Sequence, residues 1–186
     1  MSEGNSGAEV RRLAKDTVDM SAPLATLSLD AADVELRRAE IGDLPAILEL
    51  LADDPLGRSR DGAAADQGLQ PYARAFLAID ADSAQLLVVA TASAAVVGTM
   101  QLSFIPGLAR RGALRAQIEA VRVQQSYRSQ GLGTAMFEWA IAEARRHGCA
   151  LVQLTTDKTR SDAHRFYDRL GFVASHEGLN LDPPSR

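Results

Sequence analysis

Alternating or short apolar runs bounded by turn residues occur along the whole second half of the chain, and such runs predict β-strands. Two of them, residues 84–93 and 95–105, are separated by a tight turn and predict a hairpin. The predicted strands are residues 34–40, 84–93, 95–105, 116–124, 149–157 and, as one or two closing strands, 172–181.

Other segments repeat apolar residues at helical spacing and carry helix start and stop signals. Asp43 is placed to cap a helix that has Pro45 in its first turn, and residues 71–82 suit a second helix. A third runs from Leu132 to a glycine stop at Gly148, and residues 161–171 form a short fourth helix. The order of strands and helices predicts a mixed α/β sheet rather than an all-parallel one.

Composition narrows the class of protein. Residues 1–32 contain few large apolar groups and predict a flexible N-terminal tail, which leaves residues 33–184 as one domain. The net charge of −4 argues against a general nucleic-acid binder. No apolar run is long enough to span a membrane, and no signal peptide is visible, so we expect a cytoplasmic protein with no membrane contact. The single cysteine allows no internal disulfide, and the three histidines lack metal-ligand spacing, so no metal is expected.

The stretch YRSQGLGTAM, residues 127–136, joins a strand to the start of a helix. The first N–H groups of a helix have no partner inside it, and the helix dipole adds positive charge there, so an anion is favoured. Gly131 and Gly133 remove side chains that would hold the anion away, and Arg128 adds a cationic fork. The loop is therefore a candidate phosphate cradle, with a plain structural turn as the alternative.

Two common phosphate motifs do not match this loop. A Walker loop requires Lys and then Ser or Thr after its second glycine, whereas Gly133 is followed by Thr134 and Ala135. A dinucleotide fingerprint requires a third glycine where the chain has Met136. A nucleotide-phosphate binder remains a rival hypothesis that lacks these residues.

Two stretches resemble the signatures of the GNAT family of N-acetyltransferases. The run VRVQQSYRSQGLG, residues 121–133, resembles its acetyl-CoA-binding loop, and DAHRFYDRLGF, residues 162–172, resembles its second signature. The chain departs from the usual residues at Gln125, Ser129 and Arg160. The resemblance covers roughly residues 34–182, so the domain at 33–184 would be an N-acetyltransferase domain with acetyl-CoA as cosubstrate.

The resemblance also implies a fold and a cofactor site. The expected fold is a mixed, mostly antiparallel sheet flanked by helices, in which two central strands splay apart and receive the thioester. The pyrophosphate would lie on the N–H groups of residues 128–134, and the pantetheine arm would pair with residues 121–123. The implied cofactor-binding residues are Val121, Arg122, Val123, Arg128, Ser129, Gln130, Gly131, Leu132, Gly133 and Thr134.

Two residues are candidates for proton transfer. Tyr167 stands at the family's general-acid tyrosine, where it would protonate the leaving thiolate; the alternative is a tyrosine that only packs its ring. Glu119 is the candidate base, alone or through water, with an orienting role as the alternative. Simple alternation places Glu119, Val121 and Val123 on one face of their strand.

The acceptor is expected to be a primary amine of a small molecule. Residues 155–176 resemble aminoalkylphosphonate N-acetyltransferases in particular, which implies an amine with an anionic group. Protein or peptide amines, and a non-catalytic acyl-CoA-binding sensor, remain alternatives. The chain would act as a monomer or homodimer.

Overall fold

The computed structural model describes residues 22–30, 32–53 and 68–181, in which six strands form one sheet in the order of the chain. Each neighbouring pair is antiparallel except β5 and β6, which are parallel, so the predicted mixed and mostly antiparallel sheet is confirmed. The strands are β1 (Ala25–Ser28), β2 (Asp33–Arg38), β3 (Gln85–Ala92), β4 (Ala95–Pro106), β5 (Leu114–Val123) and β6 (Leu151–Leu154).

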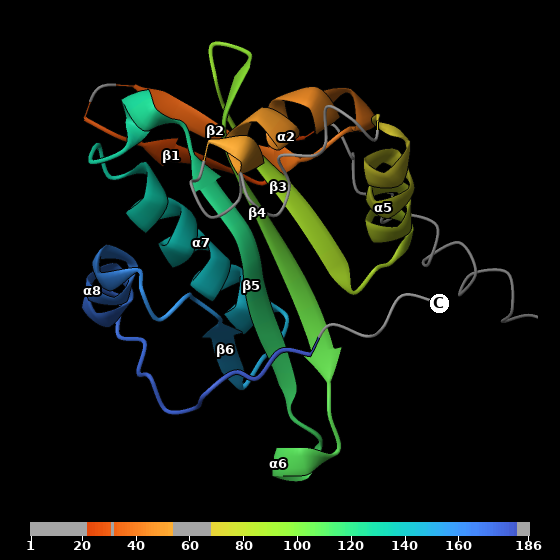
Figure 1. The fold of residues 1–186 in the computed structure, drawn as a ribbon, viewed down its shortest axis with the longest axis vertical. Helices are drawn as coiled ribbons and strands as arrows, with labels where there is room; N and C mark the ends of the chain where they lie inside the picture. Colours follow the sequence, from red (N-terminus) through yellow and green to blue (C-terminus); the bar gives the residue numbers. More distant parts are fainter. Residues whose placement is uncertain (1–21, 31, 54–67, 182–186) are drawn as a thin grey trace, which may run out of the picture.

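Helices cover both faces of this sheet (Figure 1). Helix α2 (Leu44–Ala52) packs on β4 and β5, and α5 (Gln70–Ala81) packs on β3. Helix α7 (Leu132–Arg146) lies on the opposite face against β5 and β1, beside α8 (Ser161–Arg169). The remaining helical turns are η1 (Ile41–Asp43), α6 (Ala109–Gly112) and η2 (Gln125–Tyr127).

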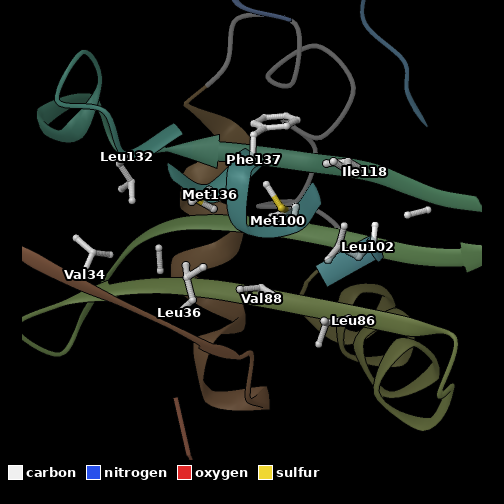
Figure 2. Packing of buried hydrophobic residues seen from close by; sticks show 14 of the residues in the cluster. Val34, Leu36, Leu86, Val88, Met100, Leu102, Ile118, Leu132, Met136 and Phe137 are labelled. Atoms are coloured by element: carbon white, nitrogen blue, oxygen red, sulfur yellow. The ribbon is translucent and has the colours of Figure 1, made fainter. Parts of the chain in front are cut away.

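The main hydrophobic cluster fills the space between the sheet and α7. Leu132, Met136 and Phe137 of α7 lie over Leu36 and Met100 of the sheet (Figure 2), and all five are at most 2% exposed. A smaller cluster on the other face joins residues of α2, α5 and β3. Strand β3 presents apolar side chains alternately to both clusters, so a slip of one residue would exchange its two faces.

The structure differs from the expected elements at both ends of the domain. Ala25–Ser28 lie within the predicted tail, yet they form strand β1 by pairing with residues 33–36 of β2. The closing strands predicted at 172–181 are absent from the described structure. Val173, Leu179 and Leu181 of that segment are at least 82% exposed, so their apolar side chains obtain no burial that would hold a strand in place.

Asp43 stabilises the turn before α2, but not by capping the helix as predicted. Its carboxylate makes no cap for α2; it accepts two hydrogen bonds from the Arg37 guanidinium, at 2.7 and 2.8 Å, and one from the Glu40 N–H at 2.7 Å. Burial acts to raise the pKa of Asp43, but these hydrogen bonds outweigh it and hold the pKa below its usual value. The pair ties β2 to the turn that starts the first helix.

Candidate functional site

Strands β5 and β6 stop pairing about halfway along β5. Parallel pairing runs from Arg115 opposite Leu151 to Ile118 opposite Leu154 and then stops, although β5 continues to Val123. Residues 120–123 are each partly exposed. The expected splay is therefore present, and it opens toward the loop that precedes α7.

A bulge interrupts β5 where it leaves β6. Gln101 of β4 pairs with Glu119, but Thr99 pairs with Arg122, so three steps along β5 oppose two steps along β4. Ala120, inside the bulge, has φ of 52°, which a residue with a Cβ rarely adopts. Bulges of this kind leave a residue outside the hydrogen-bond ladder and recur beside active sites.

The bulge reverses the alternation of side chains along β5. Ile118, before it, belongs to the cluster under α7, and Val121 and Val123, after it, pack against the same cluster. Glu119 lies on the opposite face and is exposed. The prediction that Glu119 shares a face with Val121 and Val123 is therefore wrong. An alanine in a regular alternating run gives no sign of a bulge, so sequence reasoning could not have found it.

The loop between β5 and α7 presents bare N–H groups at the start of a helix. Helix α7 has Gly131 as its N-cap and no side-chain cap, and its first backbone bond is donated by the Ala135 N–H to the Gly131 carbonyl, at 3.0 Å. Within the part of the chain that the structure describes, five N–H groups of this loop and helix start donate to no backbone carbonyl: those of Ser129, Gly131, Leu132, Gly133 and Thr134. The Gln130 N–H, between them, donates to the Tyr127 carbonyl at 3.4 Å.

The two glycines contribute in different ways. Gly131 has φ of 86°, so a side chain there would be strained. Gly133 has ordinary helical dihedrals, and a Cβ built on it would meet only Phe166 Cζ, at 3.8 Å, which is normal contact. The fold itself therefore does not require glycine at 133. Leu132 is fully buried, so it can offer a ligand only its backbone.

Arg128 and Gln130 are partly engaged within the protein. The Arg128 Nε donates to the Val123 carbonyl at 2.9 Å, and its Nη2 lies 2.6 Å from a carboxylate oxygen of Asp53, at the end of α2. The Gln130 amide donates to the Ser126 carbonyl at 2.6 Å. About half of the Arg128 side chain is exposed, so the cation is held at the loop and can still meet an anion from solvent. Its pairing with Asp53, 75 residues away, has no signal in the sequence.

Tyr167 lies in an aromatic cluster on α8. Its ring makes edge contacts with Phe137, Phe166 and Phe172, at centroid distances of 5.5 to 6.1 Å. Burial raises the pKa of the phenol, and the guanidinium groups of Arg160 and Arg122 act in the opposite direction. The phenol therefore keeps its proton at neutral pH, as a general acid requires.

Arg160 and Arg122 come from different elements, yet both act electrostatically on Tyr167. Arg122 lies on β5 just after the bulge, and Arg160 directly precedes α8. The three residues thus belong to one electrostatic neighbourhood around the end of β5. Glu119 faces away from α7, and Cys149, whose pKa is raised by burial, packs against the main hydrophobic cluster. In the described ranges no group of three or more His, Cys, Asp or Glu could hold a metal ion, and no helix is long and apolar enough to cross a membrane.

Comparison of the sequence with known proteins identifies the family to which this chain is similar. The sequence model of the acetyltransferase (GNAT) family matches residues 44–172, well over half of the chain. A glucosamine 6-phosphate N-acetyltransferase from Trypanosoma brucei brucei is 31% identical over 159 residues, which cover 82% of this chain and 98% of that protein. An aminoalkylphosphonate N-acetyltransferase from Salmonella typhimurium is 42% identical over 60 residues, but the match spans only 32% of this chain and 39% of that protein.

A solved structure is also similar. The crystal structure of a transcriptional regulator from Bacillus halodurans C-125 superposes with a TM-score of 0.75 and 46% identity, over 80% of this chain and 99% of that one. The splayed strand pair, the uncapped glycine loop and the second signature on α8 thus all occur in a chain whose residues 44–172 match the family. The chain belongs to the acetyltransferase (GNAT) family.

Proposed function

We propose that this protein is an N-acetyltransferase that moves the acetyl group of acetyl-CoA directly to the primary amine of a small molecule. The observation that carries the proposal is the set of unpaired N–H groups of Ser129 and Gly131 to Thr134, in the loop that follows the part of β5 no longer paired with β6. Oriented N–H groups at a helix start favour an anion, and the diphosphate of coenzyme A is one.

The two glycines of the loop are not crowded by other parts of the protein, which supports a ligand there. A Cβ on Gly131 would be 4.0 Å from Leu29 and one on Gly133 would be 3.8 Å from Phe166, so neither glycine is packed tightly by the protein. Arg128 would add charge to the same loop, and Val121 to Val123 would offer backbone groups to the pantetheine arm. When bound, acetyl-CoA supplies an acyl group activated as a thioester.

Two side chains carry the proton transfers in this proposal. The amine must lose a proton before its nitrogen bonds to the acyl carbon, and Glu119 or a water held by it would accept that proton. The carbon–sulfur bond breaks as the new carbon–nitrogen bond forms, and the phenol of Tyr167 would donate its proton to the sulfur. A backbone N–H of β5 beyond Ile118, where pairing with β6 has ended, would stabilise the negative charge that develops on the carbonyl oxygen.

The acceptor proposal is an amine with an anionic group. The two relatives are named for acetylation of an aminoalkylphosphonate and of glucosamine 6-phosphate, and both compounds are primary amines that carry a phosphorus-containing anion. This supports the same chemical class here, which the resemblance of residues 155–176 also implies.

A non-catalytic acyl-CoA sensor is the second candidate. It is favoured by the similar structure described as a transcriptional regulator. A sensor would bind coenzyme A through the same loop but would have no use for a protonated phenol at Tyr167. Turnover therefore separates the two.

The test is release of free thiol from acetyl-CoA over a panel of amines, phosphonates, amino acids and peptides. Wild type should release thiol with at least one amine, and Tyr167→Phe should lower kcat about 100-fold, the low end for general acid catalysis, while the Kd for acetyl-CoA is unchanged. Tyr127→Phe, which removes a phenol whose oxygen makes no hydrogen bond in the described structure, is the matched control. Binding without thiol release from any amine would favour the sensor.

A further inference from the structure

Polar side chains replace apolar ones on part of the sheet face opposite α7. On this face the cluster beneath α2 and α5 includes Leu87 and Val89 of β3. The next residues toward the end of the sheet that carries α6, away from the turn between β3 and β4, are polar across four strands. We name them the polar strip, which consists of Gln85, Gln101, Ser103, Gln117 and Gln153.

Strand register brings the polar strip together. Gln85 pairs with Ser103, Ser103 with Gln117, and Gln117 with Gln153, so one row crosses β3, β4, β5 and β6. Gln101 is one step further along the same face and pairs with Glu119. The alternation from residue 115 to 119 lies before the bulge and is regular. Ala116 and Ile118 face the cluster under α7, which places the odd-numbered residues of this stretch on the other face.

The side chains of the strip bind one another. The Gln101 amide and the Ser103 hydroxyl both donate to Gln85 Oε1, at 3.1 and 2.7 Å, and the Gln153 amide donates to Gln117 Oε1 at 2.6 Å. Ser103 and Gln117 are only 7% and 8% exposed, whereas Gln85, Gln101 and Gln153 are half-buried. Hydrogen-bonded polar side chains stabilise a sheet less than apolar ones would, and a ligand that bonds to the half-buried amides would account for their place in adjoining rows.

Charged residues stand at the two ends of the strip along β5. Glu119 lies at the end beside the bulge and the splay, and Arg115 lies four residues earlier on the same face, where its partners in the sheet are Ile105 and Leu151. Both side chains are exposed, and Arg115 makes no ion pair with any residue that the structure describes. At about 3.3 Å per residue the two Cα atoms are roughly 13 Å apart.

We propose that the polar strip is the floor of the acceptor site and that Arg115 is its specificity-determining residue. The inference rests on the proposed function, since it takes the splay beside Glu119 as the place of reaction. The ammonium group lies at the Glu119 end, hydroxyl groups of the substrate exchange hydrogen bonds with Gln101, Gln117 and Gln153, and an anion at the far end meets Arg115. The matching substrate is an elongated, hydroxylated primary amine with a terminal phosphate or carboxylate, rather than a two-carbon aminophosphonate.

The experiment compares kcat/KM for three probes: glucosamine 6-phosphate, glucosamine and 2-aminoethylphosphonate. Wild type should prefer glucosamine 6-phosphate to each of the others by at least about tenfold, the effect of one hydrogen bond to a charged group. Arg115→Gln should remove this preference over glucosamine, because only the phosphate-bearing substrate offers the guanidinium an anion. Arg145→Gln makes the same charge change on an exposed position of α7, on the other side of the sheet, and should behave as wild type.

A second variant tests the middle of the strip. Gln153→Leu should lower kcat/KM for glucosamine 6-phosphate but not for 6-aminohexyl phosphate, which separates its amine and phosphate without ring hydroxyls. If wild type shows no preference for the phosphate-bearing sugar, or if Arg115→Gln keeps it, the inference is overturned. Thiol release with other amines would then leave the proposed function intact. Absence of thiol release with every amine would instead refute the proposed function itself.

Discussion

Gly133→Ala separates what the loop does for the fold from what it does for a ligand. The substitution adds one methyl group at the second position of α7. The structure leaves room for it, because the added Cβ meets only Phe166 Cζ, at 3.8 Å, and the backbone there is helical. Glycine in a helix costs up to about 1 kcal/mol relative to alanine. The free energy of unfolding of the unliganded variant should therefore equal that of wild type or be slightly higher.

The same methyl group would stand where a diphosphate approaches the N–H groups of residues 129–134. Loss of one or two hydrogen bonds to a charged ligand, each worth about 1.5–3 kcal/mol, corresponds to at least about a tenfold higher Kd for coenzyme A. Calorimetric titration gives the Kd, and thermal unfolding of the unliganded variant gives stability. We expect affinity for coenzyme A to fall while the stability of the unliganded protein stays the same or rises.

The control is Gly42→Ala, in η1, where an added Cβ meets nothing within 4 Å and φ is not positive. It should leave the Kd unchanged. If Gly133→Ala binds coenzyme A as tightly as wild type, the diphosphate does not lie on this loop. Gly131→Ala is less informative, because its φ of 86° adds strain that would lower stability as well.

Three further predictions concern residues outside the loop. Asp43→Asn should lower the free energy of unfolding by about 1–2 kcal/mol at neutral pH, because it weakens the hydrogen bonds from Arg37. The pKa of Asp43 is lowered in the fold, so this contribution to stability is present above about pH 4 and is lost below it. Urea titrations should therefore give the same stability for wild type and variant at acidic pH. Gly98→Ala should destabilise the protein by about 1–3 kcal/mol in the same assay, because the added Cβ would lie 3.2 Å from the Arg122 carbonyl oxygen and from Met136 Sδ. An unchanged urea midpoint would mean that β4 can move away from these atoms without cost. Cys149→Ala should keep kcat within about twofold, because burial raises the thiol pKa and disfavours the nucleophilic thiolate; loss of turnover would point to a covalent acyl-cysteine.

The order of the elements and the glycine-marked start of α7 could be predicted because local patterns encode them. Apolar periodicity located β2 to β6 and the four main helices, and the glycines marked the start of α7 and the ends of α7 and α8. Gly148 and Gly171 both have positive φ directly beyond a helix, as their positions indicated.

Features that depend on contacts between distant segments could not be predicted. Strand β1 forms because residues 25–28 pair with β2, although their own composition is typical of a flexible tail. The bulge at Ala120 depends on the pairing of β4 with β5, and it changed the face on which Glu119 lies relative to Val121. The Arg128–Asp53 pair and the polar strip likewise join residues that are far apart in the chain and carry no shared motif.

The most direct measurement of the central claim compares how the wild-type protein binds coenzyme A and pantetheine, which lacks the diphosphate and the nucleotide. If the N–H groups at the start of α7 bind the diphosphate, calorimetry should show coenzyme A at least about 100-fold tighter than pantetheine, which equals about 2.7 kcal/mol. Affinity for coenzyme A should also fall as salt rises. Equal Kd values for the two ligands, or no heat of binding with coenzyme A, would contradict the account.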